Sequence, residues 1–162
     1  MIRVSQLLLA VFLTACAALN QAPGTRMPSV EFAPVGKVEI KAGSVQSVPL
    51  DFRVANDFHI NSNKPRSELL IPTVLQLSTP DAVNVISVHY PPGQDSSFPF
   101  APDEKLSVYS GDFAIAVAIK ASAKALPGTY PVSGELRYQA CDRSACYPPR
   151  TMPVKFEVSV IR

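Results

Sequence analysis

Two cysteines on either side of a short polar turn are the residues of this sequence best suited to chemistry. Cys141 and Cys146 enclose residues 142–145 and follow the alternating stretch 134–140. A second alternating stretch, 154–160, comes next, so the two stretches predict a β-hairpin with the cysteines at its open tip. Facing residues of antiparallel strands have Cα atoms about 4.5–5.5 Å apart, a separation that a disulfide can bridge. We therefore expect Cys141 and Cys146 to be able to bond to each other.

The residues alone leave two interpretations of this pair open. A structural staple is the first, but closing a loop of about six residues contributes only on the order of 2 kcal/mol, which is low for a disulfide. Thiol–disulfide exchange is the second, because a short-loop disulfide at an exposed turn is accessible to an attacking thiolate. Arg143 lies between the thiols and favours a thiolate, whereas Asp142 opposes it.

The two histidines are weaker candidates for chemistry. His59 and His89 fall on the polar sides of alternating stretches, and Asn61 shares the side of His59, so we expect these side chains to face solvent. A copper site built from Cys, His and Met would need ligands at close spacing, but Met27 and Met152 are isolated in the sequence. We expect neither a metal nor another cofactor.

The pattern of the whole chain predicts an all-β fold. Sixteen prolines, no tryptophan and recurrent β-branched alternation favour many short strands and few helices. The expected strands lie near residues 37–41, 48–54, 58–61, 73–78, 83–90, 112–120, 134–140 and 154–160. Within 83–90 the hydrophobic parity changes, which predicts a bulge or bend. Short strands at regular spacing with Pro and Gly turns between them are typical of an immunoglobulin-like β-sandwich.

A proline-rich stretch at residues 91–102 interrupts this pattern. Its prolines exclude a central strand, yet it carries Phe98 and Phe100. Two aromatic side chains on an exposed segment are expected to cover something, whether core, partner or functional site.

The N-terminal region reads as a targeting segment followed by a tether. Residues 1–16 combine a cationic start with a short apolar run, which predicts a secretory signal rather than a spanning helix. Residues 13–16 read Leu-Thr-Ala-Cys and resemble the lipobox of bacterial lipoproteins, which makes Cys16 the expected lipidation site. The alternative is an ordinary signal peptide that is cleaved near Ala18 or Ala22 and removes Cys16. Residues 17–34 are then expected to form a flexible tether and residues 35–162 the domain.

The net charge and the expected cellular compartment limit the kinds of partner that this protein can have. The formal net charge is +2 with no cluster of Lys or Arg, so we expect no nucleic-acid partner. A secreted chain with an even cysteine pair fits an oxidising compartment. We expect a periplasmic protein that is attached to the membrane through its lipid alone. The residue after Cys16 is Ala17 and not an aspartate, which favours the outer membrane.

Several segments of the chain resemble one known family. Residues 138–141 read Tyr-Gln-Ala-Cys and residues 146–149 read Cys-Tyr-Pro-Pro, which looks like the signature of the N-terminal periplasmic domain of DsbD-type thiol:disulfide interchange proteins. Weaker similarities follow in the same order along the chain, at residues 58–65, 71–73, 90–91, 108–111 and 127–130. The resemblance covers about residues 35–161.

This resemblance implies a fold and a site. It implies an immunoglobulin-like sandwich in which Cys141 and Cys146 are the redox pair, and we expect Cys146 to meet the partner's sulfur first. The family also has a cap loop with an aromatic side chain over the disulfide. The matching segment is 95–102, with Phe98 or Phe100 as the cap.

Further residues are expected to line the same site. They are His59, Asn61, Tyr138 and Tyr147. The resemblance also implies thioredoxin-fold periplasmic proteins as partners. Because the membrane-spanning region of the family is not in this sequence, we expect a separate membrane protein to donate electrons.

The leading hypothesis is therefore thiol–disulfide exchange through an oxidoreductase site at Cys141 and Cys146. The alternative is a non-catalytic immunoglobulin-like envelope lipoprotein that binds another protein through residues 91–102. In that alternative the disulfide is purely structural.

Overall fold

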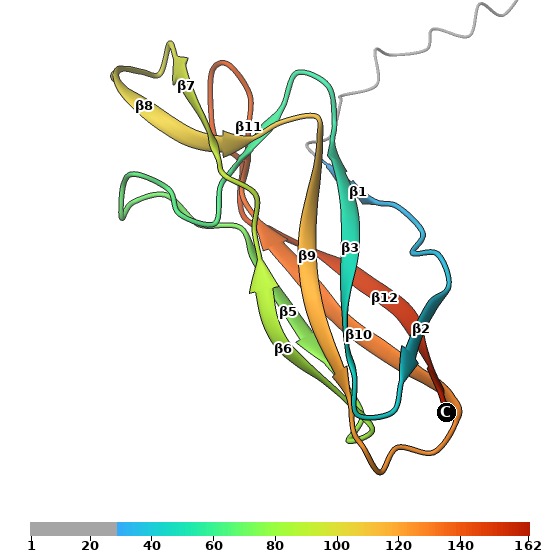
Figure 1. Ribbon diagram of the computed structural model, residues 1–162. Helices are drawn as coiled ribbons and strands as arrows, with labels where there is room; N and C mark the ends of the chain where they lie inside the picture. The colour runs from blue at the N-terminus through green and yellow to red at the C-terminus, as the bar shows by residue number, and fades with distance from the viewer. Residues whose placement is uncertain (1–28) are drawn as a thin grey trace, which may run out of the picture.

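The structure, a computed structural model, describes residues 29–162 and consists of strands joined by turns and loops (Figure 1). In chain order the strands are β1 (Val30–Phe32), β2 (Val38–Lys41), β3 (Val45–Val54), β4 (His59–Asn61), β5 (Val74–Ser78), β6 (Val83–His89), β7 (Gln94–Phe98), β8 (Ala101–Tyr109), β9 (Asp112–Ala121), β10 (Gly128–Tyr138), β11 (Ala140–Cys141) and β12 (Arg150–Ile161). The predicted all-β class is confirmed.

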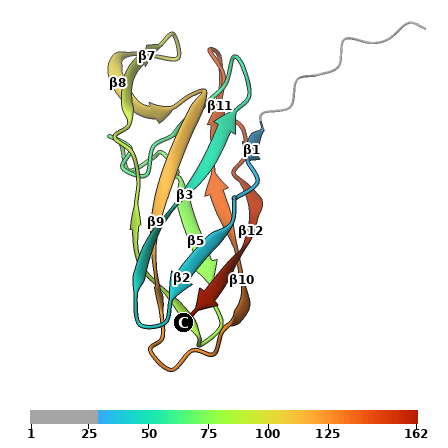
Figure 2. The same ribbon diagram turned by 45° about the vertical axis from the view of Figure 1, so that its right-hand side comes forward.

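Two of the sheets form the sandwich. One has the strand order β1-β3-β9-β6 and the other has the order β2-β12-β10-β5. Figures 1 and 2 show them as two layers that face each other along the length of the molecule. The pairs are antiparallel except that β12 pairs with β2 in parallel. This architecture matches the predicted immunoglobulin-like sandwich.

Alternation along the long strands builds the core between these layers. In β9, Ile115, Val117 and Ile119 are fully buried, and in β10 Leu136 is fully buried, while the residues between them are more exposed. Burying one such side chain contributes about 1.5–3 kcal/mol, so these inward faces supply most of the stability. The period of two in the sequence is therefore the direct cause of the two-layer arrangement.

The expected hairpin and the expected bulge are both present. β10 and β12 pair antiparallel from Gly128 opposite Val160 to Tyr138 opposite Arg150. In β6 the pairing with β9 shifts register between Val85 and Ser87, where the hydrophobic parity of the sequence changes.

A third sheet, β11-β4-β8-β7, lies at one end of the sandwich. Three of its strands follow or precede strands of the two layers, because β4 follows β3, β8 leads into β9 and β11 follows β10. The turn from β8 to β9 passes through Gly111, whose φ of 63° is readily adopted only without a side chain. β7 is an edge strand without proline: Pro91 and Pro92 precede it, Pro99 lies in the turn after it, and Pro102 is the second residue of β8.

The predicted start of the domain is wrong. Val30–Phe32, assigned to the tether, forms β1 and pairs with β3 from Val30 opposite Val54 to Phe32 opposite Phe52. Val30 is buried in the core, because its strand covers the edge of β3. Cys16, the predicted signal segment and tether residues 17–28 lie outside the described residues. In residues 29–162 no helix is long and apolar enough to cross a membrane.

Candidate functional site

The two cysteines form a disulfide at the end of the sandwich where the third sheet lies. Cys141 ends β11 and bonds to Cys146, with 2.03 Å between the sulfur atoms and 3.9 Å between the Cα atoms. This Cα separation is below the expected 4.5 Å, because the cysteines pair as an isolated bridge at a tight turn and not within a regular ladder. Cys141 is fully buried, whereas Cys146 is exposed. The bond thus presents one residue to solvent and hides the other.

Asp142 organises the turn between the cysteines. Its Oδ1 accepts hydrogen bonds from the Ser144 amide and hydroxyl, both at 2.7 Å, and from the Ala145 amide at 2.9 Å. Its Oδ2 accepts a hydrogen bond of 2.6 Å from the Tyr147 hydroxyl. The hydrogen bond from Tyr147, followed by those from Ser144 and Ala145, holds the pKa of Asp142 well below its usual range. A carboxylate is therefore held beside the disulfide in its ionised form.

Of the two tyrosines expected near the site, Tyr147 lies in it. Its hydroxyl bonds Asp142, which raises the pKa of Tyr147, and its ring meets that of Phe58 edge-on at 5.9 Å. Tyr138 is only 4% exposed and belongs to the hydrophobic core. Both tyrosines lie close to a cysteine in the sequence, so only the tertiary packing shows which of them is at the site.

The segment predicted as a cap forms a β-hairpin of β7 and β8 with aromatic side chains at its tip. The ring of Phe98 stacks on the imidazole of His59, with centroids 3.9 Å apart and planes at 14°. Phe100 continues the stack at 5.5 Å from Phe98 and remains 37% exposed. The two aromatics thus cover His59, the residue that pairs with Cys141.

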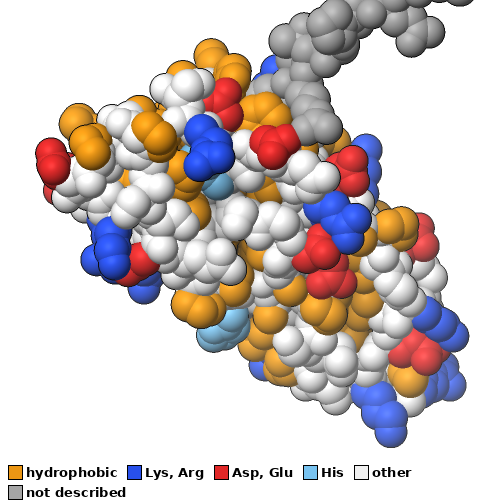
Figure 3. Space-filling view, turned by 90° about the horizontal axis from the view of Figure 1, so that it is seen from above, with side chains coloured by type: hydrophobic (Ala, Val, Ile, Leu, Met, Phe, Trp, Pro, Cys, Tyr) orange, Lys and Arg blue, Asp and Glu red, His pale blue; other side chains and the backbone are white. Residues whose placement is uncertain are grey.

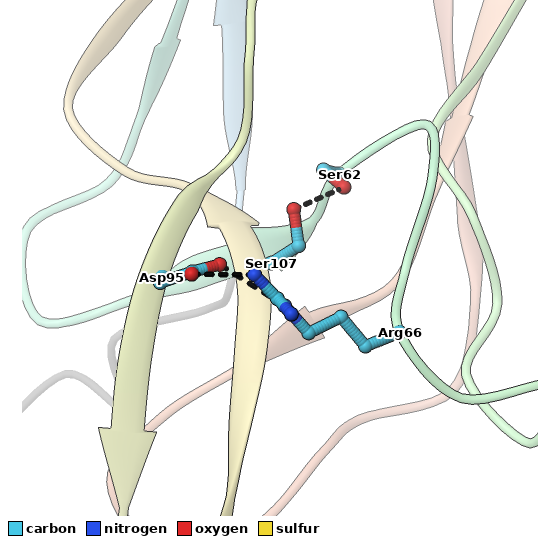
Figure 4. A network of polar contacts seen from close by, with 4 residues as sticks. All are labelled: Ser62, Arg66, Asp95 and Ser107. Carbon is cyan, nitrogen blue, oxygen red and sulfur yellow. Dashed lines mark hydrogen bonds and ion pairs between the residues drawn. The ribbon is translucent and has the colours of Figure 1, made fainter.

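Polar contacts outside the tip attach this cap hairpin to the body of the domain. Arg66 forms a bidentate ion pair with Asp95 of β7, at 3.1 and 2.5 Å, and the hydroxyls of Ser62 and Ser107 lie 2.9 Å apart (Figure 4). The ion pair is largely exposed, so its contribution to stability is small. The stack on His59 and the pairing of β8 with β4 are therefore the main contacts between the hairpin and the body of the domain.

The prediction that His59 and Asn61 face solvent is wrong. His59 is 4% exposed and Asn61 is fully buried. The alternation itself is correct, since Ile60 between them lies in the core, but the third sheet is also covered on its other side. Burial lowers the pKa of His59 to about 4, although the carboxylate of Asp142 acts in the opposite direction. His59 is therefore neutral at neutral pH.

Gln139 is a site residue that the sequence analysis did not identify. Its Oε1 accepts a hydrogen bond of 3.2 Å from Asn61, and its Nε2 donates one of 3.2 Å to the carbonyl of Tyr147. Asn61 also donates to the carbonyl of Ile71 at 3.0 Å. The side chain of Gln139 therefore joins β4 to the loop after the disulfide. The signal in the sequence was its place in the Tyr-Gln-Ala-Cys segment, two residues before Cys141.

The other candidates from the sequence, His89 and a metal site, do not contribute to the disulfide site. His89 is exposed on β6 and its Nε2 lies 3.0 Å from the Ser87 hydroxyl, as expected for a solvated side chain. Within residues 29–162, no three or more His, Cys, Asp and Glu side chains are arranged to hold a metal ion. Figure 3 looks down on the end that carries the third sheet and shows hydrophobic side chains interspersed with charges of both signs.

These features define a class of protein: an immunoglobulin-like sandwich with a disulfide, one cysteine buried and the other exposed, beside an aromatic cap. Residues 29–157 match the family described as "Thiol:disulfide interchange protein DsbD, N-terminal". The chain belongs to this family of DsbD N-terminal domains. The family and the Cys141–Cys146 pair both fit thiol:disulfide exchange.

Solved structures are similar in fold. The reduced DsbD N-terminal domain of Neisseria meningitidis is 23% identical over 73% of this chain and 80% of that chain, with a TM-score of 0.42. The DsbD N-terminal domain in complex with the PilB N-terminal domain, also from Neisseria meningitidis, gives 19% identity over 84% and 87%, with a TM-score of 0.46. A type I cohesin of Pseudobacteroides cellulosolvens is 15% identical over 83% of this chain and 94% of that chain, with a TM-score of 0.50. A search of curated proteins gave no match.

Proposed function

We propose that this domain exchanges electrons with thioredoxin-fold proteins of the periplasm through Cys141 and Cys146. The observation that carries the proposal is the asymmetry of the disulfide, in which Cys146 is exposed and Cys141 is fully buried. Exchange proceeds by attack of a thiolate on one sulfur of a disulfide, so an accessible sulfur is required. Membership of the DsbD N-terminal family and the complex of its Neisseria meningitidis relative with the PilB N-terminal domain support partners of this kind.

The exchange begins on the exposed sulfur. A partner thiolate attacks Cys146 Sγ, the bond to Cys141 breaks, and Cys141 leaves with the electron pair as a thiolate that takes up a proton. The second thiol of the partner then attacks the mixed disulfide and releases Cys146. The partner is oxidised by two electrons and the domain is reduced to the dithiol. The reverse sequence reduces a partner disulfide.

A trapping experiment tests this proposal. Cys141→Ala leaves Cys146 unable to close the internal disulfide, so a mixed disulfide with a thioredoxin-fold protein should accumulate. Cys146→Ala is the matched control and should trap far less, because Cys141 is buried. Equal absence of covalent complex in both variants, together with a reduction potential below about −300 mV, would show a structural bond.

We also propose that Cys16 carries a lipid that attaches the domain to a membrane and that a separate membrane protein donates its electrons. The four-residue segment ending at Cys16 supports the first part. Cys16→Ser should move the protein from the membrane fraction to the soluble periplasmic fraction. Unchanged membrane association of that variant would contradict lipid anchoring. Fractionation of the two envelope membranes would test the preference for the outer one.

A further inference from the structure

His59 lies directly opposite the buried cysteine. In the antiparallel pairing of β4 and β11, His59 is the partner of Cys141. Residues paired in this way project to the same face of the sheet, with Cβ atoms about 4.5–5.5 Å apart. Both residues are inaccessible, since His59 is 4% exposed and Cys141 is fully buried. An imidazole therefore lies beside the sulfur that the partner cannot reach.

The imidazole has an unused polar atom. Its Nε2 is buried and has no hydrogen-bond partner. Leaving a buried polar atom unpaired costs about 1–3 kcal/mol, and such atoms in native proteins require an explanation. A histidine retained only for packing would be expected to bond a neighbouring carbonyl or hydroxyl. The free Nε2 is explained if its partner exists only in another redox state of the neighbouring cysteine.

The reduced pair supplies such a partner. Once the disulfide is open, Cys141 carries a thiol in a buried environment, where desolvation disfavours the thiolate. Only the thiolate attacks a disulfide, so the closing step needs a base at this position. The carboxylate of Asp142 is engaged by Tyr147, Ser144 and Ala145, and it makes a neighbouring thiolate less favourable.

We propose that His59 is the general base for Cys141, an inference that rests on the exchange function proposed above. When a partner's sulfur is held on Cys146, Nε2 of His59 accepts the proton of the Cys141 thiol. Cys141 Sγ attacks Cys146 Sγ, the Cys141–Cys146 bond forms, and the bond from Cys146 to the partner breaks. The partner's sulfur leaves with the electron pair as a thiolate. The proton on His59 then passes to water.

The cap controls this base. Phe98 stacks on the imidazole and excludes water from it, and Phe100 extends the cover. Burial lowers the pKa of His59 to about 4, and Asp142 is the charged group that opposes the shift. The hairpin of β7 and β8 places aromatic rings against the imidazole of His59, and β11 places Cys141 opposite it. A partner that displaces Phe98 rehydrates His59, returns its pKa towards about 6.5 and so strengthens the base when it is needed.

A two-phase reaction with dithiodipyridine tests the proposal. The reduced domain attacks this symmetrical aromatic disulfide through Cys146 and releases one thiopyridone, and closure by Cys141 releases the second. Both releases are followed by absorbance. His59→Phe retains an aromatic ring without nitrogen, and His89→Phe is the matched control, because His89 is exposed on β6.

In His59→Phe we expect the first release to stay within about twofold of wild type and the second to slow by about 10²-fold at pH 7. The second rate should level off with rising pH in wild type, as His59 loses its proton, and climb about tenfold per pH unit in the variant. His89→Phe should behave as wild type in both phases.

Equal second-phase rates in wild type and His59→Phe would overturn the role of His59 and leave the exchange function intact. A missing first phase in wild type would instead contradict the exchange function. If His59→Phe does not fold, judged by near-UV circular dichroism, the wild-type pH profile decides. A second phase without an ionisation between pH 4 and pH 7 would then overturn the proposal.

Discussion

Protonation of His59 should make the oxidised domain less stable in mild acid. The pKa of His59 is about 4 in the folded state, because the side chain is buried, and about 6.5 in the unfolded chain. Between these values the unfolded state binds more protons, so the stabilisation is complete above about pH 6.5 and is lost as the pH falls towards 4. From pH 7 to pH 5 the loss is at most about 2 kcal/mol.

Urea unfolding of the oxidised domain at pH 7 and pH 5 measures this loss. With an m-value of about 2 kcal/mol/M, the midpoint of wild type should fall by about 1 M urea. His59→Phe should show almost no change between the two pH values, whereas His89→Phe should follow wild type. The pKa of Asp142 is also depressed, but its stabilisation is lost only below about pH 4, outside this window. An equal fall in wild type and His59→Phe would refute the reasoning.

Three further predictions concern the cap, the core and the disulfide. Arg66→Ala removes the ion pair that attaches β7 to the body of the domain, so dithiothreitol should reduce the disulfide about twofold to fivefold faster at low salt, with no difference at 1 M salt. Arg53→Ala is the control, because its ion pair joins β3 to β9, and it should react as wild type. Leu136→Ala should lower the free energy of unfolding by about 2–5 kcal/mol in urea titrations, because Leu136 is fully buried, and a loss below 1 kcal/mol would contradict its place in the core. Replacing Cys141 and Cys146 together with Ser should cost about 2 kcal/mol and leave a folded domain, since the closed loop is short; loss of folding would show a larger structural role.

The sandwich could be predicted because the alternation of hydrophobic and polar residues that defines it lies within single strands. The alternation in β9 and β10 identifies which residues point inward, and the change of parity in β6 marks the bulge. β1 was missed because a three-residue strand carries almost no periodic signal and is stabilised by pairing with β3.

The site was predicted less completely. Cys141 and Cys146 could be recognised because only four residues separate them in the sequence and their hairpin is local. His59 was assigned to solvent because alternation tells only which residues share a face. It does not tell whether a distant segment covers the second face, as Phe98 covers His59.

By itself the sequence determined the strand pattern, the pairing of β10 with β12 and the presence of two bondable cysteines at their end. The tertiary structure alone decided that Cys141 is buried and Cys146 exposed, and that His59 meets Cys141 under the ring of Phe98. The reason is that these contacts join residues far apart in the chain. Their burial depends on how the third sheet and the cap hairpin fold over the end of the sandwich.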